Sequence, residues 1–161
     1  MRFLFIFFFL FACSNLEFVY DKHYKNLLKN TTSLVTTGDQ KNVVYSQLAA
    51  LIGQNVEKTY ILEINVKEII SKEIVSSDST TSKYNVSHAI NYNLIKTSEE
   101  CSLLEKKITT TANYNSKSAG YNFGTDISKE KTIEGNIINN IESFLKAVSA
   151  LSDTAICNNE G

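Results

Sequence analysis

The sequence predicts an α+β fold: a two-layer sandwich with an antiparallel sheet of about four strands, covered on one face by two helices. Three stretches alternate apolar and polar residues with a period of two, which is typical of half-buried strands. Two other stretches place apolar residues at helical spacing. A sheet with one apolar face needs a covering layer, and the two amphipathic helices can supply it.

The first half of the domain is expected to hold a strand and then a helix. The strand is predicted near residues 28–37 and the helix over residues 40–53. Thr37, Gly38 and Asp39 supply N-cap candidates, and Gly53 suits the position just past the helix end. The apolar stripe of this helix consists of Val44, Leu48, Leu51 and Ile52.

The remaining strands are predicted over residues 60–67, 84–94 and 104–114, with apolar even-numbered residues on the inner face. A Ser/Thr-rich loop (76–82) and a hairpin loop (97–102) separate them. After a glycine-containing loop, Asp126 is expected to cap the final helix. The stripe of that helix consists of Ile133, Ile137, Ile141, Phe144, Leu145, Val148 and Leu151. The sandwich is therefore assigned to residues 33–153, and residues 154–161 form a C-terminal tail.

The amino terminus indicates export. Met1 and Arg2 precede ten apolar residues, a run too short to span a membrane and typical of a signal peptide over residues 1–12. The sequence Leu-Phe-Ala-Cys that ends in Cys13 resembles the lipobox of bacterial lipoproteins, which predicts lipidation of Cys13 and a lipidated tether over residues 13–32. An ordinary signal peptide with a cysteine near its end, or a short uncleaved anchor, is the alternative.

The composition limits the possible partners. A chain of 161 residues corresponds to one domain, and 16 basic against 17 acidic residues give a net charge of -1. With no basic run in the chain, nucleic acid is not expected as a partner. Asn, Ser and Thr together number 48, so the surface is expected to be polar and largely uncharged. The only arginine is Arg2, in the predicted signal peptide, so an anion site would have to use lysine or backbone groups.

No catalytic, metal or cofactor site is predicted. His23 lies in the tether, and His88 falls on the inner face of a strand, where a core histidine is expected. Cys101 and His88 could be proposed as a catalytic nucleophile and its base, but no third residue is evident that would orient the base. Glu99 and Glu100 form a pair of carboxylates at a hairpin tip, where they are expected to be solvated. No phosphate-binding loop or metal-ligand spacing is present.

Cys101 and Cys157 are candidates for a disulfide. A strand of about 14 residues starting near Cys101 covers about 46 Å. A final helix of about 27 residues returns about 40 Å antiparallel to it. The chain end therefore comes back toward Cys101, and a bridge to Cys157 would close a loop of about 55 residues. Two unpaired cysteines are the alternative.

The order of these segments resembles the LPS-assembly lipoprotein (LptE) family in its alphaproteobacterial form. The similarity covers most of the chain that follows the lipobox. The segments that carry it are Phe18-Val19-Tyr20, the helix at 44–53, residues 60–66 (YILEINV), 90–94 (INYNL) and 111–115 (TANYN), Gly120-Tyr121 and the long terminal helix.

The resemblance implies a non-enzymatic protein on the periplasmic side of the outer membrane. There it would assemble with the LPS-translocon β-barrel, plug the barrel lumen and assist lipopolysaccharide transport. A polar lumen fits a plug that is rich in Asn, Ser and Thr. Phosphates of lipopolysaccharide would require cations, and the candidates near strand ends and loops are Lys83, Lys106, Lys107 and Lys117.

Two other classes stay open. One is a lipid-binding auxiliary lipoprotein of an envelope ABC transport system, which should contain a defined apolar pocket. The other is an inhibitor or immunity-type lipoprotein that binds a secreted hydrolase through an exposed loop such as residues 76–82.

Overall fold

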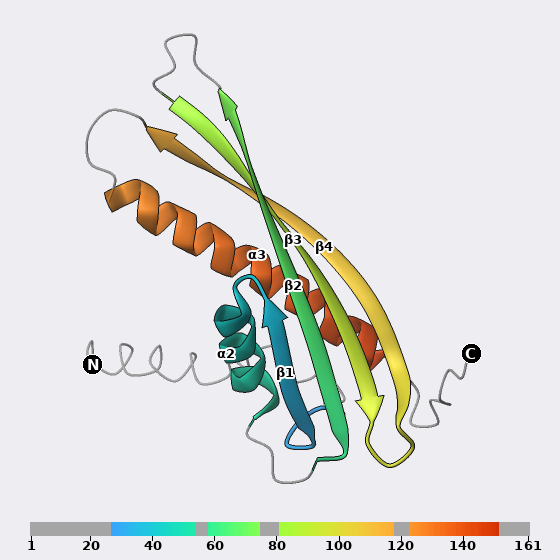
Figure 1. The fold of residues 1–161 in the computed structure, drawn as a ribbon. Coiled ribbons are helices and arrows are strands. Elements are labelled where there is room, and N and C mark those ends of the chain that lie inside the picture. The colour runs from blue at the N-terminus through green and yellow to red at the C-terminus, as the bar shows by residue number, and fades with distance from the viewer. Residues whose placement is uncertain (1–26, 54–57, 75–80, 118–122, 152–161) are drawn as a thin grey trace, which may run out of the picture.

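The fold is a sandwich of one four-stranded sheet and two helices, seen in a computed structural model that describes residues 27–53, 58–74, 81–117 and 123–151 (Figure 1). Both helices lie on the same side of the long, twisted sheet. The α+β class and the one-sided covering predicted from the sequence are confirmed. The elements in chain order are β1 (Thr32–Gly38), α2 (Lys41–Ile52), β2 (Tyr60–Ile74), β3 (Thr81–Lys96), β4 (Cys101–Lys117) and α3 (Phe123–Ser149).

The sheet is mixed, which corrects the prediction of an antiparallel sheet. Its strand order is β1-β2-β3-β4, and the pairs β2–β3 and β3–β4 are antiparallel. The pair β1–β2 is parallel, with Thr32 opposite Tyr60 and Gly38 opposite Val66. A helix between two adjacent strands returns the chain to the same end of the sheet, so the second strand runs parallel to the first. The alternation of apolar and polar residues within a strand does not show whether the strand runs parallel or antiparallel to its neighbour.

The three long strands extend beyond the alternating stretches that predicted them. β2 continues past Val66 to Ile74, although Glu68, Lys72 and Glu73 interrupt its apolar pattern. Backbone pairing explains the extension, since β2 stays in register with β3 as far as Ile74 opposite Ser82. β1 ends opposite Val66, so the second half of β2 forms an edge of the sheet (Figure 1).

Helix α2 matches the predicted range at its end and differs at its start. Gly53 follows it with φ 78, a left-handed conformation that favours glycine. The residue at the N-cap is Gln40, with φ 51 and no side-chain cap, and not one of the predicted candidates. Asp39 instead accepts a hydrogen bond from the Glu68 backbone N–H at 2.9 Å, so its carboxylate extends the β1–β2 pairing by one bond.

The core lies between the sheet and the helices. The inner, even-numbered residues of β2 and β3 pack against the stripe of α3, and the rings of Tyr92 and Phe144 stack at 4.1 Å. The predicted stripe of α3 is confirmed, with Leu145 and Leu151 at its margin. Asp126 lies inside the first turn of α3 and not at its cap, because the helix already begins at Phe123.

The packed domain begins before β1. Leu28 is buried, and the Asn30 backbone N–H donates to the carbonyl of Ile52, so these residues are fixed against α2. They fall in the last part of the predicted tether. The predicted signal peptide, Cys13, Cys157 and the C-terminal tail lie outside the described residues.

Candidate functional site

The side of the sheet opposite the helices is the first candidate site, which we call the polar face. It consists of the odd-numbered residues of β1, β2 and β3 and those of β4 from Glu105 onward, because a bulge opposite Leu94 turns Cys101 and Leu103 toward the core. No helix in the described ranges lies against it. Its central rows are Thr37–Asn65–Asn91–Lys107, Lys67–Ala89–Thr109, Ile69–Ser87–Thr111 and Ser71–Asn85–Asn113. Amides and hydroxyls therefore dominate the face. Such a surface offers hydrogen-bonding groups over most of its area, with Val35 and Ile69 as exposed apolar side chains among them.

One end of the polar face forms a depression of about 270 Å³. Glu63, Asn93 and Glu105 lie in one row across it, and Asn65 and Asn91 lie in the next. The Asn93 amide donates to Glu63 at 3.3 Å, and the Asn65 amide donates to the Thr37 hydroxyl at 2.9 Å. Neighbouring side chains thus hold one another in place across the strands, which gives a partner a fixed array of donors and acceptors.

The predicted lysines do not form one cluster. Lys107 lies on the polar face, whereas Lys106 projects to the opposite side of the sheet, opposite Tyr92. Lys83 pairs near the far end of β3, eight residues from the partner of Lys107, which corresponds to about 26 Å along a strand. Lys117 is the last residue of β4, and its side chain lies outside the described part of the chain.

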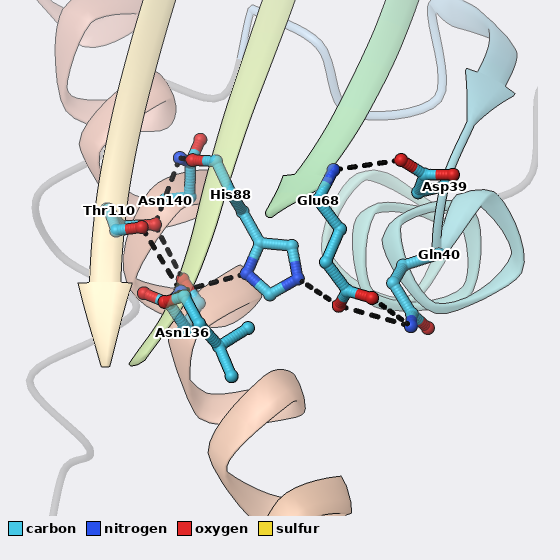
Figure 2. A network of polar contacts seen from close by, with 8 residues as sticks. Asp39, Gln40, Glu68, His88, Thr110, Asn136 and Asn140 are labelled. Carbon is cyan, nitrogen blue, oxygen red and sulfur yellow. Dashed lines mark hydrogen bonds and ion pairs between the residues drawn. The ribbon is translucent and has the colours of Figure 1, made fainter. Parts of the chain in front are cut away.

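The second candidate site is a polar network buried between the sheet and the helices (Figure 2). The imidazole of His88 has no exposed surface, which confirms a core histidine. Its Nε2 lies 2.9 Å from the Glu68 carboxylate, and its Nδ1 lies 2.8 Å from the Asn136 amide nitrogen. Gln40, at the start of α2, donates to the same carboxylate. The network therefore links β2 and β3 to both helices.

Two asparagines of α3 attach the helix to the sheet. The Asn136 amide donates to the carbonyls of Val86 and Thr110, each at 3.2 Å. The Asn140 amide donates to the carbonyl of Ile108 at 3.0 Å and to that of His88 at 3.3 Å. Each asparagine thus reaches one carbonyl on β3 and one on β4. Helix α3 is therefore centred over the seam between these two strands.

These contacts determine the proton positions in the network. The Asn136 nitrogen is surrounded by acceptors, and its two hydrogens are shared among the carbonyls of Val86 and Thr110 and His88 Nδ1. Nδ1 is therefore the accepting nitrogen of the imidazole, which assigns the ring hydrogen to Nε2, where it is directed at Glu68. The Tyr92 hydroxyl donates to Asn140 Oδ1 at 2.9 Å. Burial raises the pKa of Tyr92, which keeps this phenol protonated.

The pair of His88 and Glu68 has the geometry of a catalytic base with its orienting carboxylate. Both imidazole nitrogens are occupied by protein groups and the ring is inaccessible, so a substrate cannot contact it. Cys101 pairs opposite Lys96, eight residues along β3 from His88, or about 26 Å, which separates its sulfur from the imidazole. The arrangement fixes the position of α3 on the sheet.

The sequence predicted His88 but not the rest of the network. Asn136 and Asn140 are spaced four apart and fall between Ile133, Ile137 and Ile141 on the buried side of α3, and that spacing was the available signal. Glu68 interrupts an apolar strand pattern at an inner position, which was the second signal. Within the described ranges, no group of three or more His, Cys, Asp or Glu residues could hold a metal ion.

The predicted disulfide is described on one side only. Cys101 is buried and disulfide-bonded, and the other half of that bond lies outside the described residues. Pairing with Cys157 stays a prediction. Peptide mapping of the exported protein without reduction would test it, and a free, alkylatable Cys157 would contradict it.

Comparison with known proteins identifies the architecture. No family model matches the chain, and no curated protein sequence matches it. A lipoprotein from Caulobacter crescentus superposes with a TM-score of 0.56 at 10% identity, covering 73% of this chain and 87% of that chain. The minor lipoprotein of Acinetobacter baumannii (TM-score 0.50, 11% identity, 77% and 95% covered) and the rare lipoprotein B of Shewanella oneidensis (0.50, 12%, 75% and 95%) also match. The fold is one found in bacterial lipoproteins.

At these identities the likeness extends to the fold alone. It covers the sheet with its helices and assigns no role to any residue of the polar face or of the buried network. Among the described helices, none is both long and apolar enough to cross a bilayer.

Proposed function

We propose that this chain is a non-enzymatic lipoprotein of the outer membrane that inserts into the LPS-translocon β-barrel and assists lipopolysaccharide transport to the cell surface. A lipid on Cys13 anchors it to the periplasmic side of the membrane. The lipobox-like sequence, the resemblance to the LPS-assembly lipoprotein family and a fold shared with bacterial lipoproteins all support this proposal.

The observation that carries the proposal is the polar face. A plug must contact a polar barrel lumen over a wide area without exposing a large apolar surface. From β1 to β4 the face presents mainly Asn, Ser and Thr side chains, and its row of Thr37, Asn65, Asn91 and Lys107 crosses all four strands. Donors and acceptors spread over a sheet suit a barrel wall whose inward side chains are also polar.

Direct handling of lipopolysaccharide is a narrower part of the proposal. Lys107 is the lysine of the candidate set that stands in a central row of the polar face, beside Asn91. A phosphate of the transported lipid that passes along the face would meet its ammonium group. Lys106 lies on the other side of the sheet, so the two neighbouring lysines should contribute differently to binding.

The test is a mild-detergent pull-down of the full-length tagged protein from its native envelope, with mass spectrometry of the partners and of the Cys13 peptide. A near-equimolar outer-membrane barrel and an acylated Cys13 are expected. Asn91→Arg, at the centre of the polar face, should reduce recovery of the barrel. Asn139→Arg, an identical change at an exposed position of α3, should leave recovery unchanged.

Other partners would overturn the proposal. Recovery of ABC transport components together with bound phospholipid would assign the chain to an auxiliary lipoprotein of such a system. A stable complex with a periplasmic hydrolase would assign it to the inhibitor class. Equal barrel recovery by the wild type and by Asn91→Arg would remove the polar face from the interface.

A further inference from the structure

Among the described residues, no strand pairs with the outer edge of β4, and the pairing pattern shows which backbone groups this edge offers. Asp39 bonds to the backbone of Val66 and Glu68, so the backbone N–H and C=O groups of the even-numbered residues of β2 point toward β1. The odd-numbered residues of β2 therefore bond to β3, the even-numbered residues of β3 bond to β4, and the even-numbered residues of β4 bond back to β3. Beyond the bulge opposite Leu94, the odd residues of β4 direct their N–H and C=O groups outward.

The two open edges of the sheet differ in how they are protected. The free half of β2, residues 67–74 (KEIISKEI), carries four charged residues, which discourage strand addition. On β4, residues 108–115 (ITTTANYN) contain no charge and no proline, and Ile, Thr and Tyr favour strands. No strand in the described part of the chain covers this edge. An edge of this kind is a template for another strand.

We propose that two copies of this chain pair through their β4 edges, antiparallel about a two-fold axis at Thr111, and form a continuous eight-stranded sheet. Thr111 then faces the partner's Thr111, and Thr109 faces the partner's Asn113. On the inner side, Ile108 faces the partner's Tyr114. No like charges lie directly opposite each other in this register, whereas centring on Lys106 or Lys107 would oppose two lysines.

The helix layer is compatible with this pairing. Asn136 and Asn140 centre α3 over the seam between β3 and β4, half a strand spacing inside the outer strand. The two symmetry-related α3 helices would therefore be two strand spacings apart, about 9.6 Å. Packed helices are separated by about 8–10 Å, so the helices would meet in contact without overlapping. The pairing describes the chain when it is not inserted in a barrel, and it does not depend on the proposed function.

Cysteine cross-linking of the full-length, lipidated protein in mild detergent tests the register. Cα atoms of a directly opposed hydrogen-bonded pair are about 5.5 Å apart, within the range that a disulfide bridges. Thr111→Cys should therefore give a reducible dimer under mild oxidation. Thr109→Cys is the matched control on the same strand and face. Its two copies would be about 14 Å apart and should stay unlinked, but it should cross-link to Asn113→Cys when the two proteins are mixed.

Mass measurement in detergent by light scattering provides a second readout. The wild type is expected at twice the protein mass of one chain. Thr111→Lys should shift it to one chain, because two lysines would then face each other. Ser71→Lys, on the charged β2 edge, should leave the dimer intact. A wild-type monomer, equal cross-linking of Thr111→Cys and Thr109→Cys, or a Thr111→Cys adduct only with another protein would overturn the proposal.

Discussion

Replacing Asn140 should show how much the buried network contributes to stability. Its amide donates to the carbonyls of Ile108 and His88 and to the Thr110 hydroxyl, and its oxygen accepts from Tyr92. Asn140→Leu keeps a similar volume but leaves the buried Tyr92 hydroxyl without an acceptor, which costs about 1–3 kcal/mol. The carbonyls retain their strand partners, so each lost bond costs only about 0.5–1.5 kcal/mol.

The expected loss in the free energy of unfolding is about 2–6 kcal/mol, measured by urea denaturation with circular dichroism on the chain without its first 13 residues. Tyr92→Phe alone should cost about 1 kcal/mol, because Asn140 loses its donor. Added to Asn140→Leu, the same change should cost nothing or should stabilise, since it removes the unsatisfied hydroxyl.

The neighbouring exposed residue provides the control. Asn139→Leu changes the same side chain one position along α3, outside the network, and should alter stability by less than about 0.5 kcal/mol. Equal losses for Asn139→Leu and Asn140→Leu, or additive effects of Asn140→Leu and Tyr92→Phe, would refute the view that the amide holds the helix to the sheet.

Three further predictions concern alkaline stability, a tautomer and two glycines. Burial raises the pKa of Tyr92 above its usual 10, so above pH 10 the folded state keeps a proton that the unfolded chain releases. The contribution of Tyr92 to stability is therefore full below pH 10. Above pH 10, urea titrations should show the free energy of unfolding falling by about 1.4 kcal/mol per pH unit, and less steeply in Tyr92→Phe. A profile identical in the two proteins would contradict this. Nitrogen NMR should find the His88 proton on Nε2, and a proton on Nδ1 alone would disprove the assignment. Gly38→Ala should lower the free energy of unfolding by more than about 2 kcal/mol, because φ of Gly38 is +89 and a Cβ there would lie 2.0 Å from the Val66 carbonyl oxygen. Gly135→Ala, where a Cβ would meet nothing within 4 Å, should raise it by about 0.5–1 kcal/mol in the same denaturation assay. Equal effects of the two changes would be inconsistent with these backbone contacts.

The sequence by itself determined the elements and their buried sides. Alternation in β2 and β3 identified Leu62, Ile64 and Ile90 as core residues, and the helical stripe of α3 did the same for Ile137 and Phe144. These patterns follow from local geometry, because side-chain direction repeats every two residues in a strand and every 3.6 in a helix. Burial of one face then required the two-layer class.

Tertiary structure decided the rest, since those features depend on partners distant in the chain. The parallel pairing of β1 with β2 results from the path through α2, and the extension of β2 to Ile74 results from its register with β3. Glu68, His88 and Asn136 are separated by 20 and 48 residues, so no local pattern could show that they share hydrogen bonds. The contrast between a charged β2 edge and an uncharged β4 edge likewise has meaning only once the strand order makes both of them edges.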